Sequence, residues 1–215
     1  MTTRHYSALD QCVMNLDQMV RTVLGGHATP ERVSPADAIR QEAPLSDEER
    51  LLSLRLMRVN HAGEVAAQAL YQGQALTAHG AGVHDAMVQA SREENDHLAW
   101  CEDRIKALGG RTSLVNPAWY LGSLFIGAAA GAAGDKWSLG FVAETEHQVV
   151  RHLHEHLKRL PAHDMKSRAV LEQMGEDEAQ HATRAMEAGG APLPEPVKHI
   201  MGLTSKVMTF TAFWL

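Results

Sequence analysis

Two Glu-x-x-His motifs, Glu94–His97 and Glu178–His181, constrain this chain more than any other feature. Each motif falls in the apolar stripe of a predicted helix, and a three-residue spacing brings its two side chains round to nearly one direction. A carboxylate and an imidazole on each of two helices therefore point into a core. Because burial of an unpaired charge is costly, these groups require partners or a metal ion.

The apolar residues beside the motifs identify the two buried helix faces. The first face contains Met87, Ala90, Leu98, Cys101, Ile105 and Leu108, and the second contains Leu171, Met174, Ala182 and Ala185. Two such motifs are half of the carboxylate site that holds two metal ions in ferritin-like bundles. The other half is one inward Glu on each of two further helices. The sequence thus predicts an all-α, ferritin-like four-helix bundle.

Glu64 and Glu146 are the predicted carboxylates of the other two helices. A third Glu-x-x-His motif, Glu144–His147, includes position 146. Either Glu144 or Glu146 could therefore be the inward carboxylate of this helix, and helical phase decides between them. Glu146 shares its stripe with Val142, Val149, Val150, Leu153 and Leu157, whereas Glu144 shares a solvated face with Gln148, Arg151 and Glu155. We therefore assign Glu146 to the site and interpret Glu144–His147 as a chance pair.

Local signals place the helices and divide the chain at about residue 45. Residues 1–44 are predicted to form an N-terminal helix, over 4–24, and a Pro-containing linker. Ser46 is a typical capping residue and begins a helix that runs to about His79. Residues 45–215 form the bundle, with a long crossover at about 117–135 and a C-terminal helix at about 196–214. The remaining predicted helices end at Gly109–Gly110, extend over Asp135–Arg159, and run from His163–Asp164 to Gly189–Gly190.

Composition excludes some classes of protein. The net charge is −6 and no basic patch stands out, which argues against binding nucleic acid. Two cysteines favour a reducing compartment over a disulfide framework, and the N-terminus shows no secretory signal.

The uncharged segment 120–133 would reach roughly 21 Å as a helix, too short to span a bilayer. This segment and the C-terminal helix are expected either to pack on the bundle or to lie in a membrane surface.

Four carboxylates and two imidazoles can hold two divalent metal ions. The six predicted ligands are Glu64, Glu94, His97, Glu146, Glu178 and His181. Each ion would have one His and one terminal carboxylate, and two carboxylates would bridge the ions. This oxygen-rich set suits iron, with manganese next, and offers no thiolate for zinc. Asp96, Asp177, His61 and His152 are candidates to support the ligands by hydrogen bonds, although a solvent-facing acid or a satisfied core histidine is the alternative for each.

These residues resemble a known enzyme family. The runs Arg58–Glu64 (Arg-Val-Asn-His-Ala-Gly-Glu), Glu94–His97 and Asp177–His181, together with Glu146, are similar to those of the demethoxyubiquinone hydroxylases. The likeness covers about Leu51 to Leu215. It implies a ferritin-like fold with two iron ions, Fe2+ in the reduced form, held by the six residues above. A further histidine of the family corresponds to His152, but Leu153 stands where a Tyr is often seen.

The resemblance also implies an activity. The expected enzyme is an oxygen-dependent di-iron monooxygenase of ubiquinone biosynthesis. It hydroxylates the ring of a polyprenylated demethoxy-benzoquinol, 2-polyprenyl-3-methyl-6-methoxy-1,4-benzoquinol, with dioxygen. Expected partners are reduced nicotinamide as electron donor, a lipid-binding protein of quinone biosynthesis and the membrane surface. The expected location is peripheral, on the cytoplasmic face of the cell membrane. Iron storage in a ferritin-like cage, a manganese catalase and a purely structural bundle remain as alternatives.

Overall fold

The computed structural model describes residues 17, 20, 22 and 30–215, in which all regular elements are helices. Most of the helix predicted over 4–24 lies outside these residues. The elements are η1 (Pro35–Ala38), α2 (Asp47–Thr77), α3 (Ala81–Ala107), α4 (Asn116–Ala132), α5 (Asp135–Arg159), α6 (Met165–Glu187) and α7 (Glu195–Trp214). The all-α prediction is confirmed, and the helix bounds agree with the predicted ones to within a few residues.

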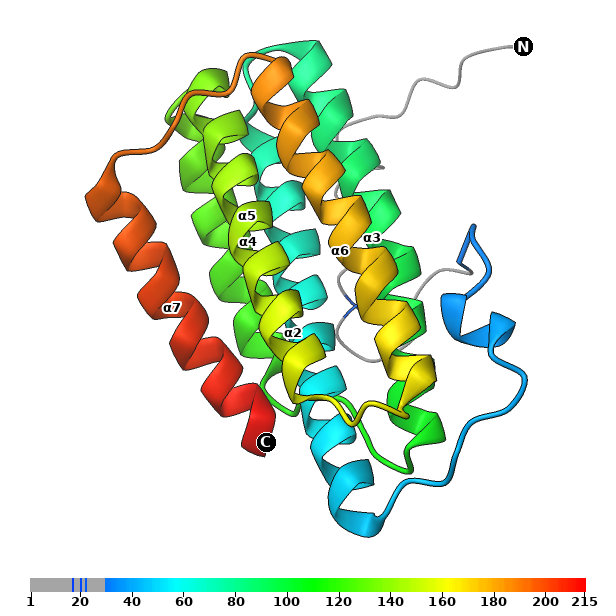
Figure 1. Cartoon of the computed structure of the whole chain (residues 1–215). Coiled ribbons are helices and arrows are strands. Elements are labelled where there is room, and N and C mark those ends of the chain that lie inside the picture. Colours follow the sequence, from blue (N-terminus) through cyan, green and yellow to red (C-terminus); the bar gives the residue numbers. More distant parts are fainter. Residues whose placement is uncertain (1–16, 18–19, 21, 23–29) are drawn as a thin grey trace.

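Helices α2, α3, α5 and α6 form a four-helix bundle, with α4 and α7 along its outside (Figure 1). Short connections join α2 to α3 and α5 to α6, and α4 lies in the long connection between these two pairs. The predicted four-helix bundle with a crossover is therefore confirmed. Residues 30–46, which we call the N-terminal strap, lie on the opposite side of the bundle from α7 (Figure 1).

The helix ends follow from local chemistry. Ser46 and Glu49 form a capping box at the start of α2: Ser46 Oγ accepts from the Glu49 N–H at 3.3 Å, and Glu49 Oε2 accepts from the Ser46 N–H at 2.9 Å. Asp164 caps α6 by accepting from the Ser167 N–H at 3.0 Å. Gly109 follows α3 with φ of +77°, a conformation that favours glycine. These caps orient the helices whose middles carry the site.

Helix α4 packs on α2 at close range. Gly73 and Gly127 lie where the two backbones meet, and a Cβ on either residue would collide with main-chain atoms of the facing helix. The opposite face of α4 leaves Leu121 and Phe125 exposed. The crossover therefore packs on the bundle, which was one of the two predicted alternatives. Its outer face is nevertheless apolar.

Helix α7 is attached through one narrow side. Ala212 is buried and Phe213 is half-buried against the bundle, whereas Leu203, Val207 and Phe210 are exposed. Among the described residues, no helix is both long enough and apolar enough to cross a bilayer. Two helices, α4 and α7, thus present apolar side chains to the outside of the bundle.

The bundle interior consists of two apolar clusters separated by a polar layer. One cluster includes Met57, Trp100, Leu153 and Met174, and the other includes Tyr71, Met87, Val142 and Ala185. On each of the four bundle helices, a predicted metal-binding residue lies between a member of the first cluster and a member of the second. The packing of both clusters therefore fixes the height and the direction of these polar side chains.

Candidate metal centre

The polar layer brings together all six of the predicted metal-binding residues. Glu64 comes from α2, Glu94 and His97 from α3, Glu146 from α5, and Glu178 and His181 from α6. All six are buried, and His181 is the most accessible at 8% exposure. Facing helix surfaces thus supply four carboxylates and two imidazoles to one enclosed region.

The His97 imidazole faces three of the carboxylates. Its Nδ1 atom lies 2.9 Å from Glu178 Oε1, 3.1 Å from Glu94 Oε2 and 3.6 Å from Glu64 Oε2. One ligand atom from each of these four residues falls within 4.8 Å of the others. A single cation at this point would have one nitrogen and three oxygen donors within reach.

The His181 imidazole faces the second oxygen of Glu94 and of Glu178. Its Nδ1 atom lies 3.0 Å from Glu178 Oε2 and 3.6 Å from Glu94 Oε1. Glu94 and Glu178 therefore each turn one oxygen toward His97 and the other toward His181. Two metal ions bound beside these imidazoles would therefore both have oxygens of Glu94 and Glu178 within reach.

The electrostatics of the layer fit a cation pair. Burial raises the pKa of Glu64 and of Glu146 well above the usual carboxyl value, and the neighbouring carboxylates raise both further. Glu94 Oε1 has no hydrogen-bond partner among the described residues. His181, despite its burial, has a pKa raised to about 9 by Glu178 and Glu94. Buried acids and an unsatisfied oxygen are destabilising in a protein without metal and become favourable donors when divalent cations bind.

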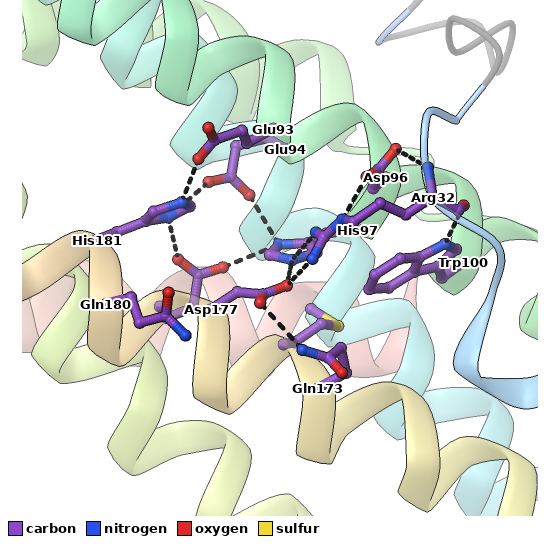
Figure 2. Close-up of polar contacts among 12 residues, drawn as sticks. Arg32, Glu93, Glu94, Asp96, His97, Trp100, Gln173, Asp177, Gln180 and His181 are labelled. Carbon is purple, nitrogen blue, oxygen red and sulfur yellow. Dashed lines mark hydrogen bonds and ion pairs between the residues drawn. The ribbon is translucent and has the colours of Figure 1, made fainter.

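A second pair of acids supports the two imidazoles from outside (Figure 2). His97 Nε2 lies 3.0 Å from Asp177 Oδ2, and His181 Nε2 lies 2.7 Å from Glu93 Oε2. Each acid directly precedes the Glu of a Glu-x-x-His motif and reaches across to the His of the other motif. With Nε2–H donated to these carboxylates, each ring presents Nδ1 to the metal pocket.

Asp177 thus occupies the supporting role considered for it, whereas Asp96 does not contact an imidazole in this way. Asp96 Oδ1 accepts from the Glu31 N–H at 2.7 Å, and Asp96 Oδ2 accepts from Arg32 Nε at 2.7 Å. The acid that supports His181 is Glu93. Sequence reasoning missed Glu93, although its place immediately before Glu94, matching Asp177 before Glu178, was the available signal.

The other candidates lie outside the six-residue layer. His61 Nδ1 is 3.3 Å from Asn116 Nδ2, at the junction of α2 and α4. The His152 ring stacks against His156 with centroids 3.9 Å apart, and burial lowers the pKa of His152 to about 4. Glu144 accepts from Gln148 Nε2 at 2.9 Å, outside the layer. Its side chain is 13% exposed, so Glu144 is more covered than the predicted solvated face implies.

Tyr71 is a further site residue that sequence reasoning used only to define a helix face. Its buried hydroxyl donates a hydrogen bond to Glu146 Oε1. Burial, followed by the charge of Glu146, raises the pKa of the Tyr71 phenol well above its usual value. Tyr71 therefore remains neutral and acts as a fixed donor that orients the Glu146 carboxylate.

An apolar cavity of about 360 Å³ adjoins the layer. It lies between α2, α4, α5 and α7, and its lining includes Glu64 and His152 at the bundle side. The lining also includes Ile126 of α4 and Ile200 of α7, which are exposed. The cavity therefore joins the Glu64 side of the polar layer to the apolar outer surface formed by α4 and α7.

Comparisons with known proteins identify relatives of this chain. The chain is 60% identical to a 3-demethoxyubiquinol 3-hydroxylase of Nitrosococcus oceani over 215 residues, which cover all of both chains. It is 58% identical to an enzyme of the same name from Stutzerimonas stutzeri, over 96% of this chain and 95% of that one. A third, from Alcanivorax borkumensis, is 51% identical over 99% of each chain.

Among solved structures, the fold resembles that of a dodecameric thioferritin, the bacterioferritin-related protein of Bacteroides fragilis. The TM-score is 0.50 at 20% identity, and the match covers 63% of this chain and 84% of that one. This likeness supports the ferritin-like fold. The profile of the family described as "Ubiquinone biosynthesis protein COQ7" matches residues 52–212. The chain therefore belongs to the COQ7 family of ubiquinone biosynthesis proteins.

Proposed function

We propose that this protein hydroxylates the ring of a polyprenylated demethoxy-benzoquinol with dioxygen, using two iron ions held in the polar layer. The names of its relatives support the reaction, since three of them are 3-demethoxyubiquinol 3-hydroxylases at 51–60% identity. The proposed ligands are Glu64, Glu94, His97, Glu146, Glu178 and His181. Two bound iron ions would supply the activation of dioxygen that hydroxylation of an aromatic ring requires.

The observation that carries the proposal is the apolar cavity that ends at Glu64. Side chains of α2, α4, α5 and α7 enclose it, and most of its lining is apolar. A quinol ring placed at the inner end would lie beside Glu64, with its isoprenoid tail extending toward Ile126 and Ile200. An iron store or a catalase acting on peroxide has no need of such a cavity, so this feature favours the hydroxylase.

The protein residues position and protect the reaction. Glu94 and Glu178 each face both imidazoles, so each would help to hold both ions. Asp177 and Glu93 hold the imidazoles in the orientation that presents Nδ1. The apolar cavity walls exclude water from the ring and limit side reactions. His152 faces the cavity with Nε2 lacking a hydrogen-bond partner among the described residues, so it can contact a polar group of the substrate.

The activity is tested with purified, iron-loaded protein, a demethoxyquinol and a chemical reductant. The expected product is heavier than the substrate by one oxygen atom. Reduced nicotinamide is the proposed physiological donor, and replacing the chemical reductant by it tests this part separately. Efficient peroxide disproportionation without quinol hydroxylation, or assembly into an iron-filled shell, would instead support catalase or storage.

Peripheral attachment to the cytoplasmic face of the cell membrane is part of the proposal. The exposed side chains Leu203, Val207 and Phe210 of α7 and Phe125 of α4 lie on two of the four helices that line the cavity. Covering such apolar surface stabilises the bound state by roughly 25 cal/mol per Å². A lipid surface here would let the substrate tail enter the cavity without crossing water.

Liposome co-sedimentation tests this attachment. Leu203→Asp combined with Phe210→Asp should release the protein from vesicles while its iron content stays unchanged. The matched control is Val33→Asp, because Val33 is even more exposed than Leu203 and Phe210 but lies in the N-terminal strap, on the other side of the bundle (Figure 1). Binding that survives the double substitution, or a wild-type protein that never binds vesicles, would contradict the membrane proposal. A lipid-binding protein of the same pathway would be sought at this same surface.

A further inference from the structure

The N-terminal strap places an arginine directly behind the metal centre. Arg32 Nη1 donates to Asp177 Oδ2 at 2.8 Å, the same oxygen that lies 3.0 Å from His97 Nε2 (Figure 2). Arg32 Nη2 is 3.5 Å from His97 Nε2 itself. The family profile covers residues 52–212, so Arg32 lies outside the segment that it matches.

Several contacts hold this arginine in place. Arg32 Nε donates to Asp96 Oδ2 at 2.7 Å, and the guanidinium lies over the Trp100 ring, 4.8 Å from its centroid. The Glu31 N–H donates to Asp96 Oδ1 at 2.7 Å, which ties the strap backbone to α3. A planar guanidinium can bind two carboxylates and stack on an indole at once, which a lysine ammonium cannot do.

The strap is anchored a second time, ten residues further along the chain. Glu42 Oε1 accepts from Arg104 Nη2 at 3.0 Å and from the Lys166 N–H at 3.0 Å. Arg104 also donates to Asp164 Oδ1 at 2.6 Å. The segment between Arg32 and Glu42 is therefore fixed at both ends to α3 and α6, the two helices that carry the Glu-x-x-His motifs.

The His97 side and the His181 side of the centre differ in how an arginine contacts the supporting acid. Gln173 donates to Asp177 Oδ1 at 3.1 Å and Gln89 donates to Glu93 Oε1 at 3.0 Å, so the amide support is alike on both sides. On the His181 side, the corresponding cation is Arg184, whose Nη1 atom lies 3.6 Å from Glu93 Oε2, beyond hydrogen-bond distance. Within the described part of the chain, an arginine donates a hydrogen bond to the supporting acid on the His97 side alone.

We infer that Arg32 is a positioning residue that fixes Asp177, and through it the His97 ring, so that the two metal positions become unequal. The inference rests on the proposed metal centre. Arg32 shares the Asp177 oxygen with His97, which limits the negative charge that this oxygen directs at the imidazole. His97 is consequently held more firmly than His181 but is the less electron-rich of the two ligands. Residues 30–46 thereby act as a strap that adjusts one metal position from outside the bundle.

The test uses Co2+ as the probe with the full-length apoprotein. Titration followed by visible absorption should show two binding steps in the wild type. Arg32→Met keeps an apolar side chain over Trp100 but removes the hydrogen bonds, and should weaken one step by about tenfold, the lower end of the range for loss of a residue that supports a ligand. Arg184→Met is the matched control and should leave both steps unchanged.

Proton NMR of the Co2+-loaded protein assigns the effect to one histidine. Each imidazole N–H should give a shifted, exchangeable signal, and Glu93→Gln identifies the His181 signal by moving it. Arg32→Met should displace the other signal and speed its exchange with solvent, with the His181 signal unmoved. Arg32→Lys should give an intermediate displacement.

Two results would overturn the inference while leaving the metal centre intact. One is an Arg32→Met protein with both binding steps and both signals as in the wild type. The other is equal displacement of both signals, which would mean that the strap only stabilises the fold. A wild-type protein that binds no Co2+ would overturn the proposed metal centre and this inference together. Far-UV circular dichroism checks that each variant retains its helices.

Discussion

Gly63 offers a direct test of the substrate cavity, because a side chain there would enter open space beside a proposed ligand. Gly63 lines the cavity, immediately precedes Glu64, and a Cβ built on it meets no atom within 4 Å. Gly63→Leu should therefore fill the inner end of the cavity without disturbing the packing of α2. We expect a stable, iron-bound protein that no longer hydroxylates a polyprenylated quinol.

The expected change in stability follows from helix propensity. Gly63 lies in the interior of α2, where glycine is about 0.8–1.0 kcal/mol less favourable than alanine, and leucine is nearly as favourable as alanine. Gly63→Leu should thus raise the free energy of unfolding by somewhat under 1 kcal/mol. For a domain of this size, that corresponds to a rise of about 2–3 °C in the midpoint of thermal unfolding.

Thermal unfolding, iron analysis and product formation are measured on the same preparations. Gly175→Leu is the control: Gly175 also lies within a helix, a Cβ there meets no atom within 4 Å, and the residue does not line the cavity. It should gain similar stability and keep its activity. Full hydroxylation by Gly63→Leu, with its iron bound, would show that the substrate ring does not use this cavity.

Three further experiments, with four substitutions between them, test the centre and its surroundings. Glu146→Gln should lower iron content and hydroxylation while Glu144→Gln leaves both intact, since only Glu146 lies in the polar layer; the reverse result, by metal analysis, would contradict the helix register. Tyr71→Phe removes the donor to Glu146 and should cost about 1–3 kcal/mol in urea unfolding, and no loss would mean that this contact is unimportant. Arg104→Met leaves the buried Asp164 without its cation and should cost about 3–5 kcal/mol; a near-neutral change would refute the structural role of that pair.

Helical phase was enough to predict the six residues of the polar layer. Glu94, His97, Glu178 and His181 lie in stripes of apolar residues, and in a bundle with one interior such stripes can face only each other. The same reasoning separated Glu146 from its neighbour Glu144. Helix bounds were predictable because capping residues and glycines at the ends act locally.

The supporting contacts could not be predicted in the same way. Asp96 and Glu93 both lie within one turn of a ligand, and the choice between them depends on how far α6 is offset along α3. That offset is a property of the packed pair of helices and leaves no periodic signal in either sequence. Arg32 comes from a strap outside the bundle, so neither helical phase nor spacing from the motifs indicates its position.

The crossover shows a different limit of sequence reasoning. Packing on the bundle and lying in a membrane surface were treated as alternatives for residues 120–133. The structure shows that the first does not rule out the second, because glycines such as Gly73 and Gly127 let α4 pack tightly along one side while Phe125 remains exposed on the outside. An uncharged, glycine-rich sequence does not reveal which of its faces is buried.

The central claim is that the six residues of the polar layer hold two irons that insert oxygen from dioxygen into a quinol ring. Single-turnover reaction of the reduced, iron-loaded protein with a demethoxyquinol and isotopically labelled dioxygen tests it most directly, with product mass as the readout. We predict one labelled oxygen atom per product and about one product for every two irons. Product oxygen that comes from water, or undiminished turnover by a Glu178→Ala protein that has lost its iron, would contradict the claim.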